Sequence, residues 1–356
     1  MMQPDPSCSG GEGALAGSYT PIEPDRARKI LEQNFGLTGT LKRFDTEKDD
    51  TFRVKTASGA LFVLKIANPD EDHAELDFQN SILRHVQARD QNLPVPRVVS
   101  SGNGRDITTI TDLDGQTRHV RVLTFLEGTP LCETNSDPAQ RRQIGRILAR
   151  LRLAMTGFTH PWQDRVYPWD VQHLLKFAHL LDEVEDPTQR DALAQGLERY
   201  RAIAPRVKGL RRQVLHNDFS KSNIVVDHGD PAFVKGIIDF GDSVNTAIAI
   251  DVATALLNQL PEQPHDDLFY RGRDVLEGYL ERTDLTEEEL ALIPHLVMAR
   301  VVVRALLTLW RAKLFPENER YIMRNTAQGW HQLDWFLAHT PDEISALLTQ
   351  YSAPKG

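Results

Sequence analysis

Two stretches of the sequence differ in how apolar and polar residues repeat. Between residues 51 and 125, apolar and polar residues alternate over short runs, as in half-buried strands. The pattern predicts strands over residues 51–56, 60–66, 106–113 and 117–125. An amphipathic helix is expected from about residue 71 to 88, and an earlier helix begins at Pro24 and ends before Gly36. The first third is therefore predicted to form a small sheet with one main helix.

From residue 128 onward, long helical patterns predominate. We expect helices over residues 137–155, 170–182, 188–205, 246–259, 266–282, 286–314, 318–338 and 341–350, interrupted by short strands at 224–226 and 233–239. Strands grouped before helices favour an α+β fold over a doubly wound sheet. We divide the chain into a disordered leader (1–20), a sheet-containing N-lobe (21–127) and a helical C-lobe (128–356), with the hinge at residues 123–130.

Composition narrows the possible partners. The 356 residues include 41 Lys and Arg against 50 Asp and Glu, a net charge of −9, which argues against nucleic acid or a membrane surface as the main partner. The N-terminus lacks the pattern of a secretion signal, and the apolar stretch 296–310 is too short and too charged to span a bilayer. Two cysteines cannot form a disulfide scaffold, so we expect a cytoplasmic protein.

The sharpest chemical signal is the segment VLHNDFSKSNIVVD (214–227), followed by KGIIDFGD (235–242). Phosphoryl transfer needs a carboxylate to accept a hydroxyl proton and oxygen ligands to hold a divalent metal ion. Asp218 on a loop can be the base. Asn223 and Asp239, at the ends of two short strands, can supply the oxygen ligands that Mg²⁺ prefers.

These two loops resemble the catalytic and metal-binding loops of the aminoglycoside phosphotransferase and choline kinase superfamily, relatives of the protein kinases. NFGL, AELDFQN, GFTHPW and YPWD are most similar to the hydroxylysine kinase branch. The resemblance implies a two-lobed protein-kinase-like fold, with Asp218 as catalytic base and Asn223 and Asp239 as Mg²⁺ ligands. The chain departs from the family at Asn217, where glycine is usual; Asn tolerates left-handed backbone better than most residues.

Such a fold places a lysine on the nucleotide phosphates, and Lys65 fits because it interrupts an apolar strand. We expect Glu75 to pair with Lys65, with Gln79, one turn later, as the alternative. Backbone groups of the connecting strand, around Thr124 and Leu126, are expected to contact the base of ATP or GTP. The turn at 44–50 is acidic and lacks the glycines of a protein-kinase phosphate loop.

The acceptor is expected to be a small hydroxyl compound, with hydroxylysine leading and choline or ethanolamine, homoserine and aminoglycosides open. Carboxylates can bind an ammonium group and arginine can bind a carboxylate, so the pocket candidates are Asp170, Asp242, Arg300 and Arg304. Asp170 is expected first of all to cap the helix that follows it. We make no prediction of the oligomeric state.

Two other functions remain open on the sequence alone. One is a non-catalytic nucleotide-binding module with the same fold. The other is a metal-dependent hydrolase built on His216, Asp218, Asp239 and His228, which leaves Lys65 unexplained.

Overall fold

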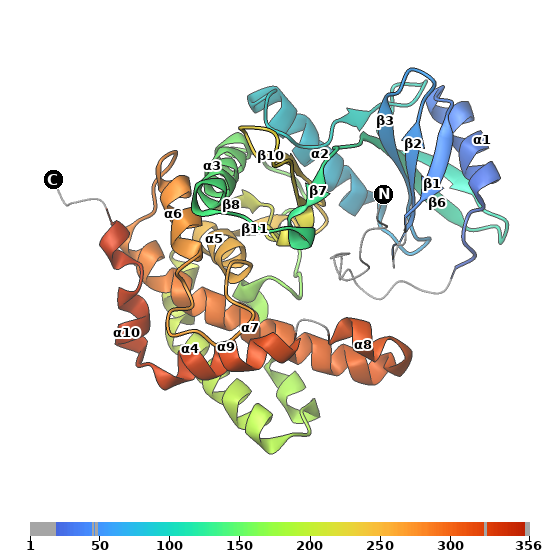
Figure 1. Ribbon diagram of the computed structural model, residues 1–356. Coiled ribbons are helices and arrows are strands. Elements are labelled where there is room, and N and C mark those ends of the chain that lie inside the picture. Colours follow the sequence, from blue (N-terminus) through green and yellow to red (C-terminus); the bar gives the residue numbers. More distant parts are fainter. Residues whose placement is uncertain (1–18, 45, 47–48, 324–325, 353–356) are drawn as a thin grey trace. The chain divides into compact units, whose positions relative to one another are not determined.

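The computed structural model describes residues 19–44, 46, 49–323 and 326–352, and Figure 1 shows its elements. Contacts within the chain define two compact units. Unit 1 comprises the chain up to Asn135 with residues 158–162 and 221–241, and unit 2 comprises the remainder. Residues 128–135 and two later segments thus belong to unit 1, although the sequence-based boundary lies between residues 127 and 128. Of the predicted leader, only Tyr19 and Thr20 belong to the described residues.

Unit 1 contains an antiparallel sheet in the order β1-β2-β3-β6-β4, with β5 also paired to β6. The strands are β1 (Thr40–Arg43), β2 (Asp50–Lys55), β3 (Leu61–Ile66), β4 (Val98–Val99), β5 (Thr108–Thr111) and β6 (Thr117–Thr124), and the helices are α1 (Pro24–Phe35) and α2 (His73–Arg89). Apolar residues of α1 form one core with Phe52, Leu64 and Val122 of the strands. The four predicted strands are present; the short β1 and β4 were not predicted.

A buried ion pair fastens the start of the described chain to this sheet. Arg118 of β6 is fully buried, and its Nη2 donates to Asp50 Oδ2 at 2.9 Å. The same carboxylate oxygen accepts a hydrogen bond from the Ile22 amide at 3.1 Å. Because loss of Asp50 would leave the buried charge of Arg118 without its carboxylate partner, the pair fixes the geometry here.

A second, smaller sheet of unit 1 has the order β10-β9-β7. It consists of β7 (Thr129–Pro130), β9 (Ile224–Val226) and β10 (Val234–Ile237), with the short 3₁₀ turns η2 (Leu131–Glu133) and η4 (Lys221–Asn223) beside it. Gly128 enters this sheet at φ 148°, and a methyl group there would lie 2.6 Å from Val225 Cγ1. Only glycine allows such an approach.

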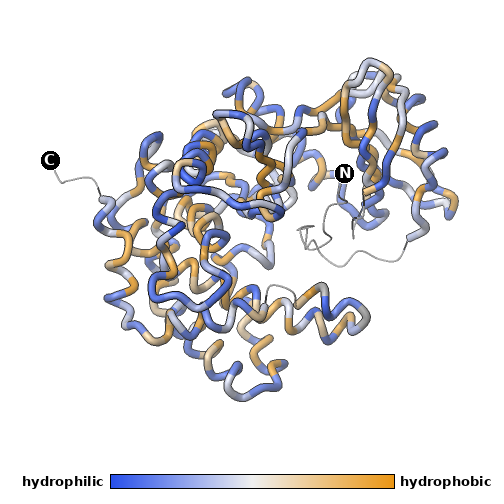
Figure 2. Tube along the Cα trace, in the orientation of Figure 1, coloured by the Kyte–Doolittle hydropathy of each residue, from blue (hydrophilic) through white to orange (hydrophobic). Residues whose placement is uncertain are grey.

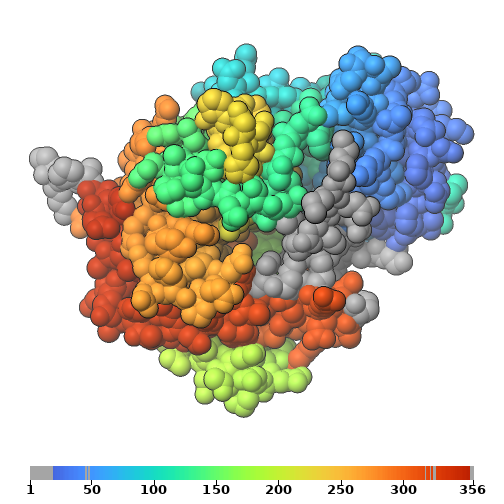
Figure 3. All heavy atoms as spheres, viewed as in Figure 1, coloured from blue at the N-terminus to red at the C-terminus, as the bar shows by residue number. Residues whose placement is uncertain are grey.

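Unit 2 is mostly helical, and its strands β8 (Arg212–Leu215) and β11 (Val244–Ala247) form one antiparallel pair. The helices are α3 (Pro138–Ala154), η3 (Val171–Glu183), α4 (Pro187–Lys208), α5 (Ile248–Leu257), α6 (Gly272–Leu280), α7 (Glu287–Leu314), η5 (Pro316–Asn318), α8 (Glu319–Ile322), α9 (Thr326–Ala338), α10 (Pro341–Ala346) and η6 (Thr349–Tyr351). Figure 2 shows hydrophobic and hydrophilic residues mixed along the chain. In Figure 3 the orange segment before α6 lies beside the red α9, where Trp335 Nε1 donates to Asp266 O at 3.0 Å.

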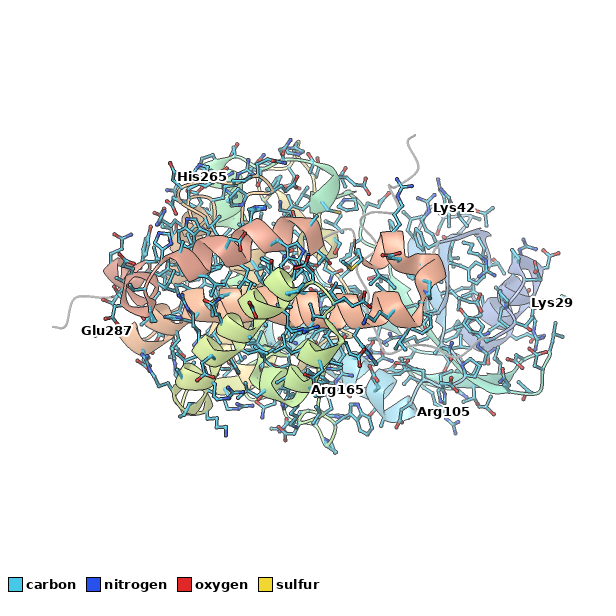
Figure 4. All side chains as sticks on the ribbon, turned by 90° about the horizontal axis from the view of Figure 1, so that it is seen from below. Lys29, Lys42, Arg105, Arg165, His265 and Glu287 are labelled. Atoms are coloured by element: carbon cyan, nitrogen blue, oxygen red, sulfur yellow. The ribbon has the colours of Figure 1, made fainter. Side chains whose placement is uncertain are left out.

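The long helix α7 forms the centre of unit 2. It begins at a capping box of Thr286 and Glu289, and Figure 4 labels Glu287 in its first turn. By length and composition α7 could cross a membrane, but 89% of its most apolar window is buried against other parts of the structure. A helix that is apolar nearly all round is expected in the core of a large domain.

Helices α3 and α6 cross at two glycines. A methyl group on Gly145 would lie 1.9 Å from Val275 O, and one on Gly278 would lie 2.0 Å from Arg142 O. Backbone therefore packs directly on backbone. Ion pairs flank the crossing, with Arg142 2.6 Å from Glu277 and Arg146 2.6 Å from Glu281.

The helix predicted over residues 170–182 is a 3₁₀ helix, η3. Its buried residues Val171, Leu174 and Leu180 are separated by multiples of three, which matches three residues per turn. The Asp170 side chain accepts from the Gln172 amide at 3.0 Å, so the capping role expected of Asp170 is confirmed.

Candidate active site

Asn223 lies directly before β9 and Asp239 lies two residues after β10, at the same end of the β9–β10 hairpin. Ile237 pairs with Ile224, and the next amide, Ile238 N, donates to Asn223 O at 2.9 Å. Asn223 is buried and Asp239 is exposed. This arrangement brings one amide and one carboxylate side chain to the same end of the hairpin.

The backbone at Asp239 is left-handed, with φ 62°. Its Oδ1 accepts a hydrogen bond from the Gly241 amide at 3.1 Å, which stabilises this sparsely populated conformation. Strain of this kind, of order 1–3 kcal/mol, persists where the surrounding structure holds a functional side chain in place.

The oxygen atoms of Asn223 and Asp239 suit a hard cation such as Mg²⁺. No group of three or more His, Cys, Asp or Glu side chains that could hold a metal ion occurs among the described residues. His228, one member of the alternative hydrolase set, instead makes a 2.8 Å hydrogen bond with Thr134 Oγ1 and packs its ring against Phe233. Among the described residues, His228 thus belongs to no such metal-binding group.

The loop that carries Asp218 is held by contacts within unit 2. It follows β8, and His216 at its start is fully buried with its ring edge-on to Phe219. The Asp218 amide donates to His216 Nδ1 at 3.3 Å, and Ser220 Oγ lies 3.5 Å from Asp218 Oδ2. Asp218 itself is half-buried, so its carboxylate is positioned by a packed loop.

Asn217 adopts the left-handed backbone that its residue type tolerates, with φ 62°. The backbone amide of Asn217 donates to Asp251 Oδ1 of α5 at 2.7 Å. Burial raises the pKa of Asp251, while His216 and the hydrogen bond from Asn217 oppose that rise. Sequence reasoning missed Asp251, an acidic residue within the apolar segment AIAIDVATALL.

Lys65 lies in β3 between Thr51 of β2 and Arg121 of β6. Its Nζ is 3.7 Å from Asp49 Oδ2, and the other oxygen of Asp49 accepts from the Asn68 amide at 3.1 Å. The carboxylate paired with Lys65 here thus comes from the residue before β2. The pairing with Glu75 stays a prediction; Glu75 lies half-buried in the first turn of α2.

Gln79, the alternative partner of Lys65, accepts a 2.6 Å hydrogen bond from Nη2 of Arg121. Burial lowers the pKa of Arg121, and the carboxylates of Asp49, Glu71, Asp239 and Glu75 act against that shift. A methyl group on Gly241 would lie 3.9 Å from Gln79 Nε2, so Gln79 is next to the loop that is predicted to bind metal. Arg121, a charge inside an apolar strand, carries the same signal that identified Lys65, but sequence reasoning missed it.

The connecting strand offers backbone groups after Thr124. The Thr124 amide donates to Arg97 O at 2.9 Å, and its hydroxyl accepts from the Arg97 amide at 2.8 Å. In the part of the chain that the structure describes, neither the amide nor the carbonyl of Leu126 forms a hydrogen bond with another backbone group. Leu126 packs its side chain on Gly236 of β10. Of the two predicted contact residues, Leu126 therefore has the more available backbone.

Tyr167 and Asp242 form a contact that the sequence did not reveal. The Tyr167 hydroxyl donates to Asp242 Oδ1 at 2.5 Å. Burial, together with the charge of Asp242, raises the pKa of Tyr167 well above its usual value, and the Asp218 charge adds to this. Arg165, labelled in Figure 4, stacks over the Tyr167 ring and donates to Ser243 O at 3.1 Å. Tyr167 and Asp242 thus lie within electrostatic reach of the predicted base.

The two candidate arginines of α7 differ in their surroundings. Arg304 Nη2 donates to Gln332 Oε1 of α9 at 3.1 Å. Arg300 is buried, and its guanidinium lies over the ring of Trp169, 5.5 Å from the ring centre. Asp170, the remaining candidate apart from Asp242, is fully buried and accepts from Thr246 Oγ1 at 3.0 Å.

Comparison with known proteins places this site in a family. Hydroxylysine kinase from Xenopus laevis is 25% identical over 346 residues, covering 90% of this chain and 91% of that protein. A homoserine kinase from Rhizobium etli is 26% identical over 319 residues, covering 88% and 94%. Among solved structures, a microcompartment-associated aminopropanol kinase superposes with a TM-score of 0.66 at 20% identity, covering 92% and 100%.

Amicoumacin kinase in complex with AMP-PNP and Ca²⁺ superposes with a TM-score of 0.64 at 16% identity, covering 86% of this chain and 94% of that one. The fold prediction, α+β with an antiparallel-sheet N-lobe and a helical C-lobe of protein-kinase type, is confirmed. A sequence profile described as the phosphotransferase enzyme family matches residues 40–292, more than half of the sequence. The chain therefore belongs to the phosphotransferase enzyme family.

Proposed function

We propose that the protein is a cytoplasmic small-molecule kinase that transfers the γ-phosphoryl group of Mg-ATP or Mg-GTP to a hydroxyl of an amino acid or amino alcohol. The placement of Asn223 and Asp239 at the same end of one hairpin carries this proposal, because these side chains offer the oxygen ligands that a nucleotide-bound Mg²⁺ requires. Relatives named hydroxylysine kinase and homoserine kinase support a hydroxy amino acid as acceptor.

In this reaction Asp218 accepts the proton of the acceptor hydroxyl as its oxygen bonds to the γ-phosphorus. The bond from the γ-phosphorus to the β–γ bridging oxygen breaks, and the nucleoside diphosphate leaves. Lys65 binds the phosphates, with Glu75 as its predicted helix partner, and the backbone near Thr124 and Leu126 contacts the base. Asn223 and Asp239 would hold Mg²⁺, which would neutralise part of the phosphate charge.

An acceptor panel tests the proposal. Hydroxylysine, homoserine, aminopropanol, ethanolamine, choline and an aminoglycoside are each incubated with Mg-ATP and with Mg-GTP, and nucleoside diphosphate release is measured. We expect turnover with at least one amino-acid acceptor. No acceptor-dependent turnover with either nucleotide would contradict the kinase function and favour a non-catalytic module.

Asp218→Asn separates the chemistry from binding. General-base catalysis contributes about 10²–10⁴-fold, so kcat should fall by that order while the Kd of the nucleotide stays within about threefold. Ser220→Ala, which changes a neighbour of the carboxylate, is the matched control and should retain most activity. Undiminished kcat in Asp218→Asn would remove the base assignment.

A further inference from the structure

Arg300 differs from the other buried arginines of the described chain. Four of them donate to side-chain acceptors: Arg118 to Asp50, Arg121 to Gln79, Arg141 to Asp274 and Arg152 to Tyr279. Arg300, only 7% exposed, has no such acceptor among the described residues, and its Nη1 is buried without a hydrogen-bond partner. A buried N–H donor of this side chain is therefore left without an acceptor.

Burying a charge without an acceptor is unfavourable, and an anion that arrives with a ligand would remove the cost. The ring of Trp169, 5.5 Å from the guanidinium, holds the side chain in place through a cation–π contact. A flat guanidinium fixed in this way is prepared for the two oxygens of a carboxylate.

The position of Trp169 connects Arg300 to the proposed reaction. Trp169 and Tyr167 belong to one turn, closed by the hydrogen bond from Asp170 N to Tyr167 O at 3.1 Å. Two residues of chain span at most about 7 Å. Tyr167 in turn contacts Asp242 and lies within electrostatic reach of Asp218. Arg300 is thus linked to the predicted base through Trp169 and Tyr167, all within unit 2.

We propose that Arg300 binds the carboxylate of the phosphoryl acceptor, so that the substrate class is a hydroxy amino acid and not the corresponding amine. The inference rests on the proposed kinase function and makes Arg300 a specificity-determining residue. Arg304, one turn further along α7, does not share this role because Gln332 already accepts from its guanidinium.

The test compares matched acceptors that differ only in the carboxylate: homoserine with 3-aminopropan-1-ol, and hydroxylysine with 1,5-diaminopentan-2-ol. In Arg300→Met, kcat/KM for the amino acids should fall about 100-fold, while kcat/KM for the amines changes less than about threefold. Arg300→Lys keeps the charge and loses the planar fork, so its kcat/KM for the amino acids should lie between those of the wild type and Arg300→Met. Arg304→Met is the matched control and should retain the preference for the carboxylate.

A second readout distinguishes binding from a structural role. If Arg300 serves the ligand, Arg300→Met without ligand should melt at the same or a higher temperature than the native protein, because a buried donor without an acceptor is gone. A wild-type measurement covers the case in which the variant does not fold: homoserine amide, which lacks the carboxylate charge, should react about 100-fold less efficiently than homoserine.

The inference is overturned if Arg300→Met loses activity equally on amines and amino acids, or if the wild-type protein treats homoserine and its amide alike. In both cases the kinase function itself stands. If no acceptor reacts at all, the proposed function fails and this inference fails with it.

Discussion

The backbone amide of Asn217 donates a 2.7 Å hydrogen bond to the buried carboxylate of Asp251 while Asn217 itself holds a left-handed conformation. The residue before the proposed base is thereby fixed by its own φ angle and by α5. Substitutions of Asn217 can therefore test whether activity requires the geometry of this loop more than the chemistry of the side chain.

Replacing Asn217 by glycine should leave kcat/KM within about threefold, since glycine adopts positive φ without strain. Asn217→Val should cost about 1–3 kcal/mol of stability and lower kcat, because a β-branched residue at φ 62° is strained and displaces Asp218. Thermal unfolding and steady-state kinetics measure the two effects. Equal behaviour of the glycine and valine variants would contradict this account.

Lys65→Met should reduce kcat/KM for the nucleotide by about 100-fold, because a charge on the phosphates is lost. Asp49→Asn should change kcat/KM by less than tenfold, since the amide oxygen can still accept from the Asn68 amide and the Lys65 side chain is unchanged. Lys42→Met, at an exposed lysine of β1 labelled in Figure 4, is the control. Nucleotide titrations at saturating acceptor give the comparison, and a Lys42 effect as large as that of Lys65 would indicate general electrostatics.

The protonation of His295 in α7 should make the stability of the protein depend on pH. Burial, with Arg206 and Arg199 nearby, lowers its pKa to about 4, and its Nε2 lies 2.9 Å from Ser345 Oγ of α10. The unfolded chain therefore binds this proton first, near the usual histidine pKa of about 6.5. Stability should fall as pH drops from about 6.5 to 4, by about 1.4 kcal/mol per pH unit at most.

His295→Gln, which cannot titrate, should show a flatter profile of unfolding free energy over the same interval. His265→Gln, at an exposed histidine labelled in Figure 4, should follow the wild type. Chemical denaturation at a series of pH values provides the data. Parallel curves of unfolding free energy against pH for the wild type and His295→Gln would rule out this histidine as the source of the pH dependence.

The close contact between α3 and α6 should not tolerate an added methyl group at its glycines. Gly145→Ala places a methyl group 1.9 Å from Val275 O unless the helices separate, so we expect a loss of at least about 1–3 kcal/mol. Gly209→Ala, whose methyl group would lie 3.4 Å from the nearest atom, should be within about 1 kcal/mol of the wild type. Urea denaturation compares the two variants, and equal stability would mean that the helices adjust without cost.

The four strands predicted in the first third, most of the long helices and the places of Lys65, Asn223 and Asp239 along the strands followed from local patterns, since each depends on residues a few positions apart. The pairing of Lys65 with Asp49 depends on the register of β2 and β3, and that of Gln79 with Arg121 joins residues 42 apart. Period and propensity carry no information about such contacts. The 3₁₀ form of η3 was missed for a related reason, because a spacing of three also occurs on one face of an α-helix.

The winding of η3 sets how far the chain reaches after the Tyr167–Asp170 turn. At about 2.0 Å per residue its 13 residues span about 26 Å, against about 20 Å at the α-helical rise of 1.5 Å. The same amino acids wound as an α-helix would draw the two ends about 6 Å closer together. The distance that the chain covers between α4 and the aromatic pair Tyr167 and Trp169 therefore depends on helix pitch, and a mutation that rewinds this segment would move the proposed acceptor-binding residues without replacing any of them.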